Sequence, residues 1–70
     1  MIEVDVRGLS CPMPVIRTKK ALESIESGNV VVILNDATAR DNVKRLATSK
    51  GCAVSEEKKG DDFYLTLTKR

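Results

Sequence analysis

Cys11 is the residue whose surroundings best suit chemistry, because it stands between a glycine turn and two prolines in Arg7-Gly8-Leu9-Ser10-Cys11-Pro12-Met13-Pro14. A strand pattern precedes this segment and a helical pattern follows it. A thiol at the start of a helix lies near the positive end of the helix dipole, which favours the thiolate. The thiolate is the form of sulfur that acts as a nucleophile. The segment therefore predicts a reactive cysteine.

The expected stabilisation of the thiolate is modest but useful. A helix N-terminus stabilises an anion by about 0.3–1 kcal/mol, which lowers the pKa of a thiol and leaves it partly ionised near neutral pH. Pro12 and Pro14 have no N–H group, so the backbone of Met13 is expected to be the best donor to the sulfur. Arg7 either folds back toward Cys11 and adds to this effect, or pairs with Asp5.

A structural role is the alternative for Cys11, which would then be only a small N-cap residue. The local spacing alone favours neither interpretation. However, Ser, Thr, Asn and Asp are better caps than Cys, and Ser10 is available next to it. The use of cysteine here suggests that sulfur itself is needed.

The elements that must position this cysteine follow from the hydrophobic periodicity. Alternation predicts a half-buried strand over residues 2–6, and helical spacing predicts a helix over about 12–26 with Pro12 in its first position. A continuous apolar run predicts a central strand at 30–34. Thr38 and Asp41 resemble a capping box for a second helix that ends before Gly51.

Two more strands complete the pattern, one starting at Cys52 and one around 63–67, with a turn at 58–61. The order is βαβαββ, and right-handed crossovers place both helices on one face of the sheet. We therefore expect an α+β fold, a two-layer sandwich, with residues 1–70 as a single domain.

Composition excludes several classes of function. The chain has no histidine and two cysteines, so a Cys–His catalytic pair is absent and neither a zinc site nor any other metal site is expected. The net charge of +2 is too small to indicate nucleic-acid binding by itself. No apolar stretch is long enough to span a bilayer, so no membrane association is expected. Free cysteines without an export signal favour the reducing cytoplasm.

The segment Asp5-x-Arg7-Gly8-Leu9-x-Cys11-Pro12-x-Pro14, which contains a Cys-Pro-x-Pro motif, resembles the TusA/SirA/YedF family of small sulfur carriers. The resemblance covers essentially the whole chain. It implies a four-stranded mixed sheet of order 1-2-4-3, with the fourth strand antiparallel. It also implies that Cys11 carries sulfur as a persulfide, without a cofactor.

The same resemblance implies the partners. Sulfur would come from a cysteine desulfurase or another donor protein and go to an acceptor sulfurtransferase. In the TusA branch this relay leads towards tRNA 2-thiouridine. Whether such a carrier is called an enzyme is partly convention, since it is loaded and unloaded in each cycle like a transfer intermediate.

The chain departs from the TusA branch at Met13, where that branch tends to have Glu. The stretches 18–22 and 42–45 look more like the N-terminal domain of YedF-type proteins. Those proteins are associated with selenium metabolism, and some carry a second domain. Both the tRNA-thiolation and the selenium assignments therefore stay open. Whether the chain is a piece of a longer protein also stays open.

A partner-docking rim is expected at the sheet edge where the two helices start. Strand order 1-2 would place the helix starts near Pro12 and Ala39 side by side, with N–H groups of both at one edge. We expect Leu9, Met13 and Arg40 to form part of this rim.

Other candidate residues have simpler interpretations. Cys52 is expected to be a buried small hydrophobe rather than a resolving thiol, and too far from Cys11 for a disulfide. Val31, Ile33 and Tyr64 should point to the open sheet face, where ordinary strand propensity is favoured over a contact patch.

A second functional hypothesis is an RNA-binding or regulatory protein-interaction domain. Its support is a set of basic residues on the helix faces, namely Arg17, Lys19, Lys20, Arg40, Lys44 and Arg45. The aromatic stacking platform of an RNA reader is missing, since Phe63 should be core and Tyr64 stands alone. Direct nucleic-acid binding is therefore not expected.

Overall fold

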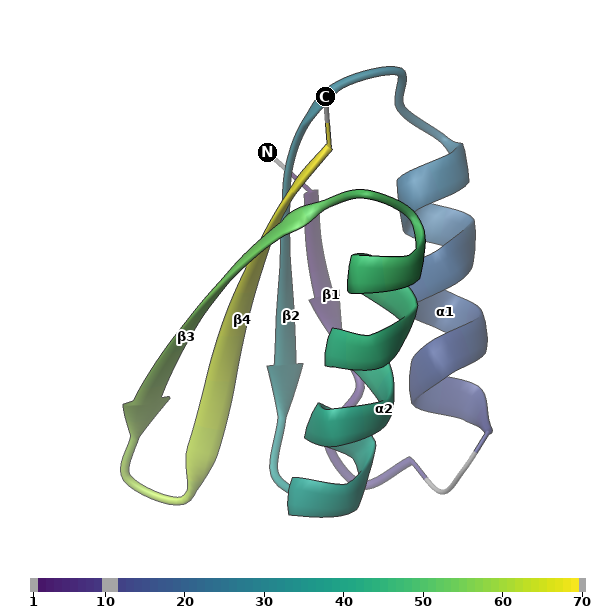
Figure 1. Ribbon diagram of the computed structural model, residues 1–70. Coiled ribbons are helices and arrows are strands. Elements are labelled where there is room, and N and C mark those ends of the chain that lie inside the picture. Colours follow the sequence, from purple (N-terminus) through teal and green to yellow (C-terminus); the bar gives the residue numbers. More distant parts are fainter. Residues whose placement is uncertain (1, 10–11, 70) are drawn as a thin grey trace.

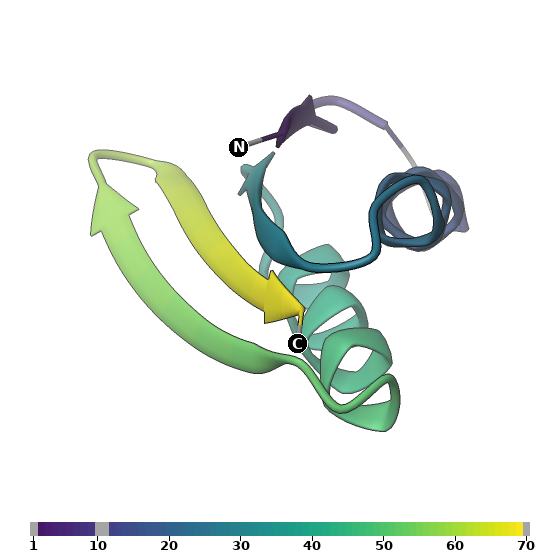
Figure 2. The ribbon, with the colours of Figure 1, turned by 90° about the horizontal axis from the view of Figure 1, so that it is seen from above.

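The computed structural model describes residues 2–9 and 12–69. Its elements are β1 (Ile2–Asp5), α1 (Met13–Glu23), β2 (Gly28–Leu34), α2 (Ala37–Ser49), β3 (Ala53–Lys59) and β4 (Asp62–Lys69). The strands form one sheet in the order β1-β2-β4-β3, and both helices lie on one face of it (Figures 1 and 2). The predicted two-layer α+β sandwich with strand order 1-2-4-3 is confirmed.

Strand pairing explains which residues form the core. β1 is parallel to β2, and β4 runs antiparallel between β2 and β3. Val30 pairs with Leu67 and Val32 with Leu65, so these four side chains share the face turned to the helices. All four are fully buried, and Val43 of α2 is buried in the same cluster.

Helix α1 is shorter than its sequence pattern predicts. It starts at Met13 and ends at Glu23 instead of spanning 12–26. At its end, the Lys69 ammonium donates hydrogen bonds to the carbonyl oxygens of Leu22 (2.7 Å) and Ile25 (2.9 Å). A lysine from the far end of the chain therefore satisfies two carbonyl groups that are left without amide partners where the helix ends.

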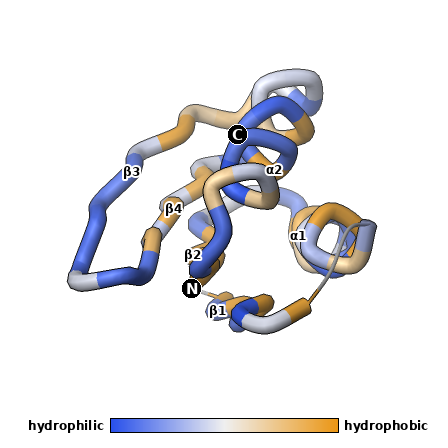
Figure 3. The backbone as a smooth tube through the Cα atoms, turned by 90° about the horizontal axis from the view of Figure 1, so that it is seen from below, coloured by the Kyte–Doolittle hydropathy of each residue, from blue (hydrophilic) through white to orange (hydrophobic). Residues whose placement is uncertain are grey.

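The hairpin between β3 and β4 is tighter than predicted. Lys58 and Lys59 belong to β3, and the turn is reduced to Gly60 and Asp61. Gly60 has a φ of 62°, a left-handed conformation that glycine adopts readily. Figure 3 shows β3 as largely hydrophilic, which suits an edge strand because charged side chains discourage pairing with other chains.

The open face of the sheet carries Val31, Ile33 and Tyr64, as predicted, since Ile33 pairs with Tyr64 across β2 and β4. However, Ile33 is only 5% exposed. The Arg7 side chain joins Asp5 of β1 to Asp62 of β4, so it passes over β2, which lies between them.

Large exposed hydrophobic residues occur elsewhere in the described chain. Met13 is 37% exposed and Ile16 is 39% exposed, and both belong to the start of α1. Neither described helix is long and apolar enough to cross a membrane.

Candidate functional site

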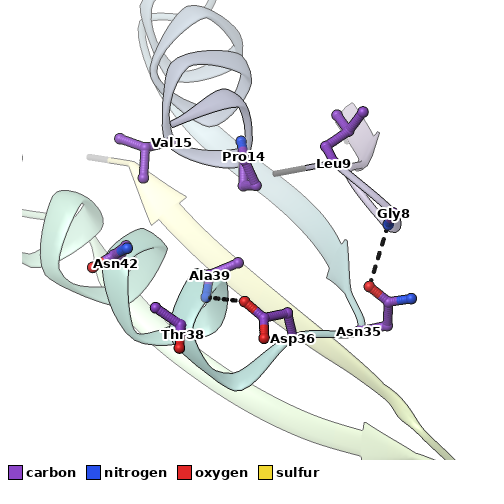
Figure 4. Close-up of a pocket in the computed structure, with 9 residues that line it drawn as sticks. All are labelled: Gly8, Leu9, Pro14, Val15, Asn35, Asp36, Thr38, Ala39 and Asn42. Atoms are coloured by element: carbon purple, nitrogen blue, oxygen red, sulfur yellow. Dashed lines mark hydrogen bonds between the residues drawn. The ribbon is translucent and has the colours of Figure 1, made fainter. Parts of the chain in front are cut away.

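The starts of α1 and α2 lie next to each other beyond the carboxyl ends of β1 and β2 (Figures 1 and 4). A cavity of about 360 Å³ opens between them. Its lining combines both helix starts with the two loops that lead into them: Gly8, Leu9, Pro14, Val15, Asn35, Asp36, Thr38, Ala39 and Asn42. Cys11 lies outside the described residues, but Leu9, two positions before it, and Pro14, three positions after it, both line this cavity.

The loop before the cysteine is held by its own backbone amides. The Arg7 amide donates to Asp5 Oδ1 (3.1 Å), the Gly8 amide to Asn35 Oδ1 (3.2 Å) and the Leu9 amide to the Val6 carbonyl (3.2 Å). Gly8 has a φ of 77°, so a side chain at this position would strain the turn. The predicted importance of Gly8 thus has a conformational reason.

Helix α1 begins one residue later than expected. The carbonyl of Pro12 accepts the first helical hydrogen bond, from the Ile16 amide (3.1 Å), so the N-cap is Pro12. The expectation that Cys11 is the N-cap and Pro12 the first helical residue was therefore wrong. Cys11 directly precedes the N-cap in sequence.

Among the described residues, no side chain caps the amides in the first turn of α1. Pro12 has no side-chain capping bond, and the turn contains no acidic residue. Pro14, now the second helical residue, is buried and has no N–H group. The N–H groups of Met13 and Val15 remain, because the helix itself offers them no acceptor.

An internal hydrogen bond supports this uncapped turn. The Thr18 hydroxyl, which is fully buried, donates to the Pro14 carbonyl at 2.8 Å. A buried hydroxyl needs such a partner, and the bond joins the second turn of α1 to its first.

Helix α2 begins in the opposite way. Asp36 is its N-cap, with an extended backbone, and its Oδ2 accepts from the Ala39 amide at 3.0 Å (Figure 4). The predicted capping box of Thr38 and Asp41 was wrong, because the N-cap lies two residues earlier than Thr38. Asp41 instead pairs with Arg40 at 3.0 Å.

Arg7 pairs with Asp5, which was one of its two predicted arrangements. The guanidinium contacts Asp5 at 2.7 Å and Asp62 at 2.9 Å. Its side-chain and backbone hydrogen bonds lower the pKa of Asp5 to about 2, and the two carboxylates raise the pKa of Arg7. Arg7 therefore holds the loop to the sheet.

The three residues expected to form a docking rim lie in different surroundings. Leu9 is half-buried and lines the cavity, whereas Met13 is exposed. Arg40 is drawn toward β3: its guanidinium lies 3.5 Å from Glu56 and 4.7 Å from the centre of the Phe63 ring. Hydrogen bonding from Lys44, together with the nearby Arg40 charge, lowers the pKa of Glu56.

A second, more open cavity of about 480 Å³ continues the site between the helices. It is lined by Pro12, Val15, Asn42, Arg45, Leu46 and Ser49. Val15 and Asn42 line both cavities. The sequence interpretation missed Asn35, Asn42 and the exposed Ile16. Of these, Ile16 alone carried a signal, as an apolar residue three positions after Met13.

Cys52 is buried, as predicted. It is 9% exposed within the hydrophobic core, and its amide donates to the Ala47 carbonyl at 2.9 Å. In the part of the chain that the structure describes, no group of three or more His, Cys, Asp or Glu residues could hold a metal ion. The predicted separation of the two cysteines involves Cys11 and lies outside the described residues.

Comparison with known proteins gives one consistent result. The sequence model of the family described as Sulfurtransferase TusA matches residues 2–69. The chain is 35% identical over 69 residues to the Sulfur carrier protein TusA of Allochromatium vinosum, covering 96% of this chain and 91% of that protein. It is 48% identical over 62 residues to a Neisseria meningitidis protein whose name also describes a sulfur carrier, covering 87% and 84% of the two chains.

A solved structure agrees with the sequence matches. The crystal structure of a SirA-like protein from Desulfitobacterium hafniense superposes with a TM-score of 0.90 at 34% sequence identity. The match covers 97% of this chain and 96% of that protein.

Proposed function

The chain belongs to the TusA family of sulfurtransferases and sulfur carriers, and we propose that it accepts sulfur on Cys11 as a persulfide and passes it to an acceptor protein. The names of its relatives support the sulfur-carrier role. The persulfide, the reacting residue and the partners are the parts that we propose.

The uncapped start of α1 is the observation that carries this proposal. Cys11 directly precedes the N-cap residue Pro12, and the Met13 and Val15 amides have no acceptor within the helix. Because no acidic side chain lies in the first turn, the positive end of the helix dipole is available to an external anion. A thiolate or a persulfide on Cys11 is an anion that this positive helix end would stabilise.

The proposed transfer step conserves atoms and electrons. The Cys11 thiolate attacks the terminal sulfur of a persulfide on the donor protein. A new S–S bond forms at Cys11, the donor's S–S bond breaks, and the donor leaves as a thiolate. The sulfane sulfur is neither oxidised nor reduced, so the step needs no cofactor. The acceptor's thiolate repeats the same exchange in the second step.

The docking surface is proposed to lie around this helix start. Leu9 lines the cavity and Met13 presents an exposed apolar side chain, so both can contact a cysteine desulfurase or an acceptor sulfurtransferase. Arg40 is proposed as a charged contact at the β3 side of the rim. Met13→Asp and Arg40→Glu should weaken donor binding, and unchanged affinity in both variants would contradict this surface.

The most detailed part of the proposal is the pathway that receives the sulfur. Transfer towards tRNA thiolation and a role in selenium metabolism both use a cysteine that carries a chalcogen, and trapping a mixed disulfide on Cys11 would identify the acceptor. A reactive thiol persists best in a reducing compartment, so the proposal includes a cytoplasmic location.

The direct test is sulfur loading. The protein is incubated with a cysteine desulfurase and cysteine, and peptides are analysed by mass spectrometry under non-reducing conditions. We expect one added sulfur atom on the Cys11 peptide, none in Cys11→Ser, and normal loading in the matched Cys52→Ala variant. Loading that survives in Cys11→Ser would refute the proposal.

A further inference from the structure

Asn35 connects the two loops that form the site. It follows β2 directly, yet its side-chain oxygen accepts a hydrogen bond from the Gly8 amide of the other loop, 27 positions away in sequence (Figure 4). Asn35 is not needed to cap α2, because Asp36 already does so. Its side-chain acceptor therefore serves the loop before Cys11 and not its own helix.

We propose that Asn35 is a positioning residue for sulfur transfer, which holds the loop before Cys11 in place. The inference rests on the function proposed above. Asn35 acts through the Gly8 backbone and does not itself touch the transferred sulfur.

The argument starts from the two ends of the segment around Cys11. On one side, Gly8 is tied to Asn35, and Leu9 is tied to the Val6 carbonyl. On the other side, Pro14 is buried and accepts the bond from Thr18. Five residues separate the two tied positions Gly8 and Pro14, so fixing both ends limits the places that the sulfur can reach.

The same bonds determine which amides can serve the sulfur. The amides of Arg7, Gly8 and Leu9 all donate to other acceptors. Loss of the Asn35 acceptor would release the Gly8 amide and let the loop move away from α1. The thiolate would then lose part of its stabilisation, and Cys11 would react more like a free cysteine.

The chemical nature of Asn35 is also informative. An amide oxygen accepts the Gly8 hydrogen bond without placing a second negative charge beside Asp36. An aspartate would keep the acceptor but add a charge that disfavours the thiolate. Salt can separate these effects, because it screens an exposed charge and does not remove the hydrogen bond between Asn35 and the Gly8 amide.

The experiment compares Asn35→Leu and Asn35→Asp with the matched control Asn29→Leu. Asn29 lies near the start of β2, at the opposite end of that strand from Asn35, and its Oδ1 accepts a hydrogen bond from Thr68 (3.0 Å). For each protein, the rate of Cys11 alkylation by iodoacetamide is measured from pH 5 to 10 at low and high salt, with peptide-resolved mass spectrometry. Thermal melting and sulfur loading by a desulfurase are measured in parallel.

Asn35→Leu should slow alkylation and sulfur loading at neutral pH by roughly two- to tenfold, the factor that one hydrogen bond provides. Its reactivity profile should shift to higher pH at both salt concentrations. Asn35→Asp should show such a shift at low salt and approach the wild type at high salt. Asn29→Leu should melt at a similarly reduced temperature and keep the wild-type profile.

Two results would overturn the inference: an Asn35→Leu profile identical to that of Asn29→Leu, or an Asn35→Asp profile that stays shifted at high salt. Failure of the proposed function looks different. In that case the wild type would take up no sulfur, while the alkylation profiles would still decide whether Asn35 positions Cys11.

Discussion

The two helices start at the same edge of the sheet, but their first turns are held in opposite ways. The start of α2 is capped from outside by the Asp36 carboxylate, which accepts from the Ala39 amide. The start of α1 has no side-chain cap from any residue that the structure describes, and it is supported from inside by the Thr18 hydroxyl. A capped start contributes stability, whereas an uncapped start keeps N–H groups for an external partner.

This difference also separates the electrostatics of the two starts. The expectation was that both helix starts would present N–H groups at the same edge of the sheet. Asp36 occupies the positive end of α2 with its own negative charge, so α2 attracts an anion much less than α1 does. We therefore place the proposed sulfur chemistry at the start of α1, and the start of α2 lines the cavity beside it.

Removing the cap of α2 should give the largest change in stability. Asp36→Ala leaves the Ala39 amide without its acceptor, and loss of an N-cap destabilises a protein by about 0.5–2 kcal/mol. For a domain of this size, about 1 kcal/mol corresponds to a fall in Tm of about 4–8 °C. Thermal melting measures the change, and sulfur loading of the folded variant should persist. A Tm equal to that of the wild type would show that the two starts do not differ in this way.

Removing the internal support of α1 should have a slightly smaller effect. Thr18→Val keeps the shape of the side chain but deletes the hydroxyl that donates to the Pro14 carbonyl. The expected destabilisation is about 0.5–1.5 kcal/mol, the net value of one hydrogen bond. Urea unfolding measures it, and the neighbouring exposed substitution Lys19→Ala serves as a control. A Thr18→Val variant as stable as that control would remove the argument for internal support.

Adding a charge to the start of α1 should reduce the reactivity of Cys11. Pro12→Asp places a carboxylate where α1 now has none, and it should slow Cys11 alkylation at neutral pH by roughly two- to fivefold at low salt. The neutral variant Pro12→Asn is the matched control. Equal rates for the two variants would mean that the charge at this helix start does not govern the cysteine.

The smallest effect concerns pH and the loop before α1. The pKa of Asp5 is about 2 when folded, below its ordinary value of 3.8, because of hydrogen bonds from Arg7. A depressed folded pKa stabilises the protein above the ordinary pKa, and this contribution disappears as the pH falls through about 2. The stability difference between wild type and Asp5→Asn should therefore be constant from pH 5 to 7 and shrink towards pH 2. Acid titrations followed by circular dichroism would show this, and a constant difference down to pH 2 would contradict it.

Much of the fold could be predicted because local patterns report it. Alternation in β1 and helical spacing in α1 and α2 predicted the order of the elements, and Gly8 and Gly60 marked turns that need positive φ. Strand order 1-2-4-3 came from the family resemblance. Helix boundaries were less accurate, because caps depend on single backbone conformations: Pro12 and Asp36 took the cap positions expected for Cys11 and Thr38.

The sequence by itself determined the alternation of strands and helices, the buried Cys52 and the segment that holds Cys11, because these depend on neighbouring residues and their periodicity. Only the tertiary structure decided that Arg7 reaches Asp62, that Arg40 turns to Glu56, and that Asn35 holds Gly8. These pairs are 55, 16 and 27 positions apart. Such contacts exist only after packing brings separate loops and strands to the same place, so no local pattern encodes them.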